Sequence, residues 1–159
     1  MAQKAEAPEY LKIPYTVSVP CKFSAGRYMG KMFLGLKNDK KIWANKCPKC
    51  GRIMFPPRAF CGSCHGVEAG EWVELSDKGT LKAFDVVYYP FVDPTTGETL
   101  PIPWAHGLIM LDGGGTMDHF LSVTDPEKLK EGMRFQAVWR EEGRIGEMTD
   151  IIHFKPIEE

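Results

Sequence analysis

Apolar residues recur at helical spacing near the start of the chain. Five of them fall at i, i+1, i+4, i+5 and i+8: Tyr28, Met29, Met32, Phe33 and Leu36. This spacing predicts an amphipathic helix with Ser24 as its N-cap and an end near residues 37–41. Its apolar face either packs into the protein's own core or occupies a groove on a partner protein.

Three glycines weaken this helix. Gly26, Gly30 and Gly35 each cost about 1 kcal/mol relative to alanine, so we expect the helix to need a surface on which to dock. The residues before it, 1–22, are interrupted by prolines and are predicted to be extended.

Short β-like runs alternate with turns after residue 67. The predicted strands cover residues 80–89, 105–112, 116–123, 133–140 and 145–154. Three consecutive glycines, 113–115, join the second and third strands as a hairpin. Along the first strand Leu81 and Ala83 share one face, and the apolar alternation changes parity at Ala83 and Phe84. This change predicts a bulge that bends a long strand.

A short helix is predicted between the third and fourth strands. Asp125 or Thr124 is the cap, Pro126 lies in the first turn, Glu127 can complete a capping box, and Gly132 ends the helix. Five strands with a short helix between the third and the fourth follow the order of an OB-fold barrel.

Two cysteine pairs lie between the helix and the strands: Cys47, Cys50, Cys61 and Cys64. Each C-x-x-C places two thiolates on one tight turn, and four thiolates complete the tetrahedral shell of a structural Zn²⁺. Gly51 and Gly62 allow the backbone to fold around the ion and to direct N–H groups at sulfur. The sequence therefore predicts a zinc ribbon with two knuckles.

Two other uses of the four thiols have to be weighed. A redox dithiol fits less well, because two pairs at this separation suit one ion and no thioredoxin-like pattern surrounds them. Iron takes the same four thiolates in a rubredoxin-like site, and the spacing does not distinguish it from zinc. With four sulfur ligands either metal has no open position, so we expect a structural and not a catalytic ion. His65, next to Cys64, is interpreted as a surface residue.

The fold class that follows is mainly β: an N-terminal amphipathic helix, a four-cysteine zinc ribbon and a five-stranded OB-fold barrel. The expected boundaries are residues 1–45 for the N-terminal extension and helix, 46–66 for the ribbon and 67–159 for the OB-fold domain. The longest irregular stretch, Pro90–Trp104, contains apolar residues that are costly to leave in water, so we expect it to contact another surface.

No self-sufficient active site is evident along the chain. Cys21, the fifth cysteine, lies among basic residues that would lower its pKa, but no histidine is near it in sequence to act as a base. His106, His119 and His153 lie on separate predicted strands, and no motif connects them. We therefore assign no catalytic residue.

Charge is divided unevenly between the two halves. Residues 1–66 carry 12 Lys/Arg and 3 Asp/Glu, whereas residues 67–159 carry 8 and 18. The basic half is expected either to meet an anionic ligand or partner, or only to balance the acidic half on one solvated surface. No apolar run has the length of a membrane span, and the N-terminus lacks the apolar stretch of a signal peptide. We expect a cytoplasmic protein without membrane contact.

Four stretches together resemble a known family. They are "GRYMGKMFLGLKNDK", "CPKCGRIMFPPRAFCGSCHG", "GTLKAFDVVYYP" and "DIIHFKPI", within a match that covers about residues 24–157. The family joins a rubredoxin-like zinc ribbon to an OB-fold, and its members are small subunits of thiolases, acyltransferases and side-chain-cleaving aldolases. The stretch "IPYTVSVPCKFSAGRYMGKMF" and the tail are also similar to the small subunits of 2-benzoylsuccinyl-CoA thiolases, from anaerobic toluene breakdown. The long Pro90–Trp104 loop departs from shorter members.

The resemblance implies a non-catalytic partner of a thiolase-like subunit in a hetero-oligomer, with nucleophile and base on the larger chain. The family's zinc ligands carry over to Cys47, Cys50, Cys61 and Cys64, and no catalytic residue carries over. A coenzyme A thioester is then the expected shared ligand, since its phosphates suit basic side chains. The candidates for contact with coenzyme A or the partner are Lys46, Lys49, Arg52 and Arg58.

Two other functions compete with this interpretation. A module for single-stranded nucleic acid is the first, because zinc ribbons and OB-folds both bind single strands through basic grooves and stacked aromatics. The acidic composition of the OB half counts against it. An iron-containing electron carrier is the second, and it would be red where a zinc protein is colourless.

Overall fold

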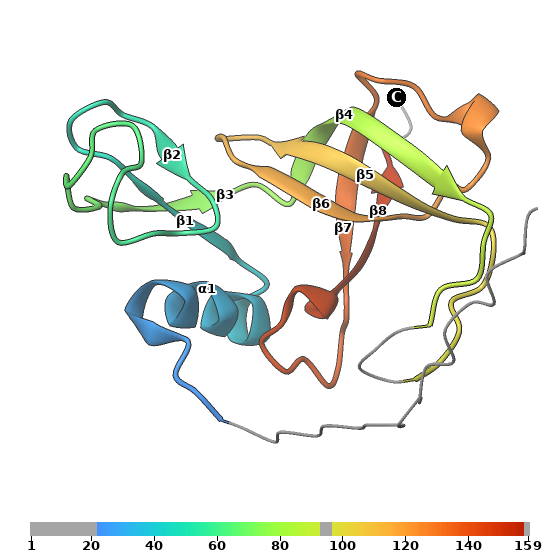
Figure 1. Ribbon diagram of the computed structural model, residues 1–159, viewed down its shortest axis with the longest axis horizontal. Helices are drawn as coiled ribbons and strands as arrows, with labels where there is room; N and C mark the ends of the chain where they lie inside the picture. The colour runs from blue at the N-terminus through green and yellow to red at the C-terminus, as the bar shows by residue number, and fades with distance from the viewer. Residues whose placement is uncertain (1–21, 93–96, 158–159) are drawn as a thin grey trace, which may run out of the picture.

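The computed structural model describes residues 22–92 and 97–157, in which one helix, a small sheet and a barrel follow one another. Figure 1 shows the small sheet at one end of the molecule, the barrel at the other, and the helix beneath both. The predicted fold class, mainly β with one N-terminal helix and a five-stranded OB-fold barrel, is confirmed. Cys21 and most of the segment predicted to be extended lie outside the described residues.

Helix α1 (Gly26–Asp39) follows the predicted apolar stripe. Met32 and Leu36 are fully buried, so this face packs into the protein's own core. The N-cap differs from the prediction: Ala25 occupies it, while the Ser24 hydroxyl accepts a hydrogen bond from the Gly26 N–H at 3.1 Å. Gly35 is required by packing, because a Cβ there would lie 2.3 Å from the indole of Trp43.

The ribbon is organised on a three-stranded antiparallel sheet. The central strand is β1 (Ile42–Lys46), with β2 (Ile53–Met54) on one side and β3 (Trp72–Leu75) on the other. Because β3 pairs with β1 along four residues, the sheet includes chain on both sides of residues 46–66. The cysteine knuckles therefore extend from a sheet that is closed by pairing distant in sequence.

Five strands close the barrel in the order β4, β5, β6, β8 and β7. Their bounds are Lys78–Val87 for β4, Trp104–Leu111 for β5, Thr116–Leu121 for β6, Arg134–Trp139 for β7 and Ile151–Pro156 for β8. Neighbouring strands are antiparallel except β6 and β8, which are parallel and pair at one position, Leu121 with Phe154. This parallel contact is the seam at which the barrel closes.

Three local predictions need correction. The bulge of β4 lies between Leu81 and Ala83, so Leu81 is buried and Ala83 exposed instead of sharing a face. The short helix after β6 is one 3₁₀ turn, η1 (Pro126–Lys128); the Asp125 side chain caps it by accepting the Glu127 N–H. The first half of the predicted last strand is a second 3₁₀ turn, η2 (Met148–Asp150), because the buried Asp150 carboxylate binds the backbone there.

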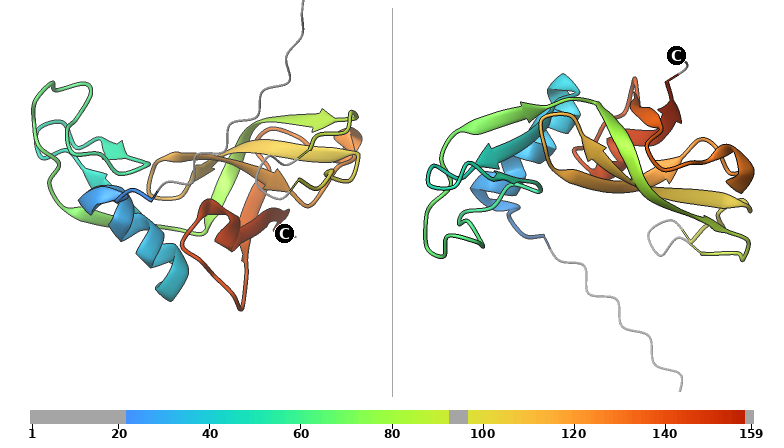
Figure 2. Two further views of the ribbon diagram at one scale, coloured as in Figure 1. Left: turned by 60° about the horizontal axis from the view of Figure 1, so that its bottom comes forward. Right: turned by 90° about the horizontal axis from the view of Figure 1, so that it is seen from above.

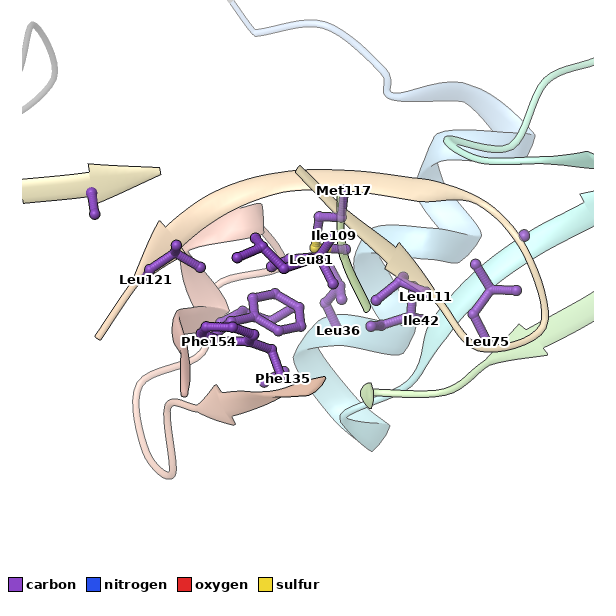
Figure 3. Close-up of a cluster of buried hydrophobic side chains, with 14 of the residues drawn as sticks. Leu36, Ile42, Leu75, Leu81, Ile109, Leu111, Met117, Leu121, Phe135 and Phe154 are labelled. Atoms are coloured by element: carbon purple, nitrogen blue, oxygen red, sulfur yellow. The ribbon is translucent and has the colours of Figure 1, made fainter. Parts of the chain in front are cut away.

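One hydrophobic core runs from the barrel interior to the helix and the ribbon sheet. Figure 3 shows Phe135 and Phe154 from the barrel meeting Leu81, Ile109 and Leu36, with Ile42 and Leu75 continuing toward the ribbon. The glycine hairpin between β5 and β6 lies over β2 and β3, since Cβ positions built on Gly114 and Gly115 approach Ile53, Phe55 and Leu75. Figure 2 shows the ribbon sheet, the helix and the barrel from two further directions.

The Pro90–Trp104 loop continues the β4–β5 hairpin as an arm. Val92 pairs with Thr99, and the Leu100 N–H donates to the Phe91 carbonyl oxygen at 2.8 Å. The Phe91 ring lies 6.4 Å from that of Trp104, but Phe91 and Ile102 remain exposed, so the described part of this chain covers the loop's apolar surface only in part. At 14 residues α1 is the longest described helix, too short to span a bilayer.

Candidate metal centre

The four cysteines predicted as ligands converge at one point, and the first of them, Cys47, directly follows β1. Their sulfur atoms all lie within 4.8 Å of one another, and Cys50 Sγ and Cys61 Sγ are 3.8 Å apart. Sulfurs at about 2.3 Å from a tetrahedral Zn²⁺ are about 3.8 Å from each other, so the cluster has the size of a zinc site. Cys47 and Cys61 are buried, whereas Cys50 is exposed.

Each knuckle is held by backbone hydrogen bonds. In the first, the Cys47 N–H donates to the Arg52 carbonyl oxygen and the Gly51 N–H donates to that of Cys47, both at 2.9 Å. In the second, the Cys61 N–H donates to the Val67 carbonyl oxygen at 3.0 Å. These bonds define the turn in each knuckle and so direct the paired sulfur atoms toward one point.

The glycines in the two knuckles do not act alike. Gly51 has φ +71°, as the prediction for the first knuckle requires, but Gly62 is not in the left-handed region. The second turn uses His65 at φ +44° and Gly66 at φ +74° instead. His65 is exposed, which confirms its interpretation as a surface residue.

Neighbouring thiols and the backbone around them shift the pKa values of Cys47 and Cys64. N–H groups of Cys50 and Lys49 lower the pKa of the Cys47 thiol to about 7. The neighbouring thiol of Cys50, followed by burial, raises the pKa of Cys64 to about 12. Four adjacent thiolates repel one another, and a divalent ion supplies the charge that allows all four to ionise. The donor set fits Zn²⁺, which would stabilise the ribbon without an open coordination position.

The four basic residues predicted to bind coenzyme A or a partner divide into three environments. Arg52 and Arg58 line one recess of about 210 Å³ on the ribbon surface. Lys46 lines a different recess, where its Nζ lies 3.6 Å from Glu71 Oε1. Lys49 is exposed and lines neither recess. The structure thus brings the two arginines together and separates them from the lysines.

A buried asparagine that was not predicted from the sequence fixes the backbone of Arg58. Asn45 Nδ2 donates to the Arg58 carbonyl oxygen at 2.7 Å, and the Arg58 N–H donates to Asn45 Oδ1 at 3.3 Å. A single asparagine within the apolar strand "IWANK" was the available signal, since a fully buried amide needs partners. Through it β1 holds the segment that carries Arg58.

Two of the histidines thought to be unconnected have defined partners. His106 Nδ1 lies 3.4 Å from Asp118 Oδ1, across the outer faces of β5 and β6. His119 points into the seam, where its Nε2 is 3.2 Å from the Met148 carbonyl oxygen and its Nδ1 accepts the Phe120 N–H at 2.9 Å. In the described residues no serine or cysteine hydrogen-bonds a histidine, so neither group forms a nucleophile–base pair.

Two segments match families of known domains. Residues 37–68 match the ChsH2 rubredoxin-like zinc ribbon domain, and residues 72–140 match the ChsH2 C-terminal OB-fold domain. Among solved structures, a chain of the Ltp2-ChsH2(DUF35) aldolase superposes with a TM-score of 0.61 at 20% identity, covering 85% of this chain and 98% of that one. A DUF35 protein of unknown function from Sulfolobus solfataricus gives a TM-score of 0.53 at 26% identity, covering 72% and 77%.

Curated relatives lead to the same family. A DUF35 domain-containing scaffold protein from Methanocaldococcus jannaschii is 33% identical over 116 residues, which is 71% of this chain and 79% of the relative. One from Methanothermobacter thermautotrophicus is 28% identical over 119 residues, 72% of this chain and 86% of the relative. The identity, the coverage and the shared ribbon and barrel establish that the chain belongs to the DUF35 domain-containing family.

Proposed function

We propose that this protein is a non-catalytic subunit of a thiolase-type acyl-CoA acyltransferase complex, in which it supports assembly and binding of the coenzyme A thioester. The observation that carries the proposal is its relationship to proteins named as scaffolds, over 79% of the length of one of them. At the level of the fold, it also resembles a DUF35 chain named together with Ltp2 in an aldolase.

The proposed zinc ligands are Cys47, Cys50, Cys61 and Cys64, and their role is structural. A four-sulfur shell leaves the ion no position for water or substrate, so the reaction belongs to the partner. The ribbon is the rigid part that presents Arg52 and Arg58. We keep the boundaries 1–45 for the N-terminal extension and helix, 46–66 for the ribbon and 67–159 for the OB-fold domain as a proposal.

The recess between Arg52 and Arg58 supports a contact with coenzyme A. Neither guanidinium makes a side-chain hydrogen bond or ion pair within the described residues, so both are available to an anion. Arginine binds phosphate with paired N–H donors, and coenzyme A carries several phosphate charges. Lys46 and Lys49, which lie apart from this recess, are proposed as partner contacts.

The finer assignment is a thiolase acting on 2-benzoylsuccinyl-CoA, and it rests on the resemblance of the N-terminal stretch.

The competing nucleic-acid function is disfavoured by the barrel. From residue 83 to residue 127 the chain has no lysine or arginine, which leaves β5 and β6 without basic side chains to follow a nucleic-acid backbone.

Purification of the tagged chain from its native host tests the proposal. A thiolase-like chain should co-purify in fixed stoichiometry, and the mixed subunits should cleave or form a coenzyme A thioester that neither chain turns over alone. Thioester turnover by this chain alone, or recovery with nucleic acid in place of a protein partner, would overturn it.

A further inference from the structure

The barrel seam opens into a cavity that the proposed subunit role does not use. Strands β6 and β8 pair only at Leu121 and Phe154, where the Ser122 N–H also donates to the Phe154 carbonyl oxygen at 2.9 Å. Toward the start of β8 lies a cavity of about 330 Å³, here called the seam pocket. Its lining residues come from both sides of the seam and include His106, Asp118, His119, Phe120, Arg140 and Ile152.

The walls of the seam pocket are mainly apolar. Phe120 contributes an aromatic ring on the β6 side, and Ile152 lines the pocket from β8. Ile152 is 46% exposed, so its side chain is accessible to a ligand. A cavity of this size and composition suits a small organic molecule with an apolar body.

Arg140 provides a positive charge at the pocket, and no other group in the described residues pairs with it. Its guanidinium makes no hydrogen bond or ion pair in the described part of the chain. By contrast, Arg144, four residues later, donates to three carbonyl oxygens. The backbone of Arg140 is fixed, because its N–H donates to the Asp150 carbonyl oxygen at 2.8 Å. A fixed backbone with a free guanidinium is suited to paired hydrogen bonds with a carboxylate.

The other ionisable groups of the pocket restrict the ligand to one negative charge. Asp118 faces His106 at 3.4 Å, and its carboxylate would repel a second anionic group. His119 is fixed between Met148 and Phe120, and burial lowers its pKa, so it adds no positive charge at neutral pH. Arg140 is then the cation of the seam pocket.

We propose that the seam pocket binds a small monocarboxylate, with the carboxylate on Arg140 and the apolar body between Phe120 and Ile152. This site lies on the barrel and is separate from the arginine recess of the ribbon. It requires neither a partner protein nor coenzyme A, and so it can be tested independently of the proposed function.

An NMR titration of the zinc-loaded, ¹⁵N-labelled full chain tests the site. Benzoate and hexanoate are the probes, and benzamide and hexanamide are uncharged controls of the same shape. The acids should shift the amide signals of Phe120, Thr149 and Ile152 saturably, and bind at least about tenfold more tightly than the amides, because only the acids form charge-assisted hydrogen bonds.

Variants identify the residues responsible. Arg140→Gln should weaken the acids about tenfold, to the level of the amides, whereas Lys130→Gln, an exposed charge elsewhere on the barrel, should leave binding unchanged. Ile152→Asp, at an exposed position, should abolish acid binding while the spectrum stays that of a folded chain. Equal binding by Arg140→Gln, shifts that map to Arg52 and Arg58, or no saturable shift up to about 20 mM acid would overturn the proposal.

Discussion

The guanidinium of Arg144 donates a hydrogen bond from Nε to the carbonyl oxygen of Lys37 at 2.7 Å, between residues 107 positions apart. Lys37 lies in the last turn of α1, whose carbonyl groups lack helical partners, and Arg144 lies in the loop between β7 and β8. The same guanidinium donates to the carbonyl oxygens of Arg140 and Glu141 at 2.9 and 2.8 Å. One side chain therefore fastens the helix to the barrel.

Replacement of Arg144 by alanine should loosen α1 selectively. The change removes three hydrogen bonds from a half-buried cation, so we expect the free energy of unfolding to fall by about 1 to 2 kcal/mol. Hydrogen exchange should quicken in residues 33–39 more than in the ribbon. Glu142→Ala, an exposed change in the same loop, is the control. A uniform increase across the chain, or none, would contradict a local role for Arg144.

This contact shows what periodicity along a sequence does and does not predict. The stripe from Tyr28 to Leu36 predicted the helix and its buried face, because helix spacing is a local property. Which surface the stripe covers depends on how the barrel closes, and that brings together residues more than 100 positions apart. Arg144 carried no local signal of a role at a helix end.

In the candidate metal centre, too, local features were predicted from the sequence and contacts between distant segments were not. Cysteine spacing predicted the four-sulfur cluster, since each pair is confined to one turn. It did not predict that β3 completes the ribbon sheet, or that Lys31 Nζ lies 4.6 Å from the ring centroids of both Trp43 and Trp72. Pairing of Trp72 with β1 creates that aromatic site, and pairing partners are not encoded in spacing.

Acid should destabilise the barrel through His119. Burial lowers its pKa below the ordinary value of 6.5. Between the two pKa values His119 is therefore protonated in the unfolded chain and neutral in the folded chain. This contribution to stability is complete above about pH 6.5 and is lost as the pH falls from there through the folded-state pKa, by at most about 1.4 kcal/mol per pH unit.

The change that tests this is His119→Gln. Urea unfolding at pH 7.5 and 5.5 should show a smaller loss of stability for the variant than for the wild type, although the variant is less stable at pH 7.5. His65→Gln alters an exposed histidine and should keep the full loss. An unchanged pH dependence in His119→Gln would show that another group is responsible.

Removal of one zinc ligand should unfold the ribbon. Cys50 is exposed, so Cys50→Ser disturbs little packing and acts through the lost thiolate. Because binding of structural zinc contributes directly to folding, the variant should lose its zinc to a chelator, lose hydrogen-exchange protection in residues 42–75 and no longer bind the partner. Elemental analysis and gel filtration measure these effects.

The control for this change is Cys21→Ser, which removes the one cysteine outside the two pairs and should retain one zinc per chain. Purified wild type should also be colourless. A red protein would indicate that the site holds iron and not zinc. Normal assembly by Cys50→Ser would show that the metal has no structural role.

Substitution of both ribbon arginines should weaken binding of coenzyme A without weakening binding of the partner subunit. Arg52 and Arg58 share one recess, and Asn45 fixes only the backbone of Arg58, so Arg52→Gln with Arg58→Gln leaves the ribbon folded. In the assembled complex the double variant should raise KM for the thioester about tenfold or more with kcat unchanged, because a phosphate contact is made equally in the ground and transition states.

Comparison of coenzyme A with dephospho-coenzyme A identifies which phosphate the arginines bind. If they bind the 3′-phosphate, the wild-type complex prefers coenzyme A, and the double variant should treat the two alike. Lys82→Gln removes an exposed charge on the barrel and should keep the preference. An unchanged KM in the double variant would place coenzyme A away from the ribbon, while a fall in kcat alone would assign the arginines to assembly of the partner's site.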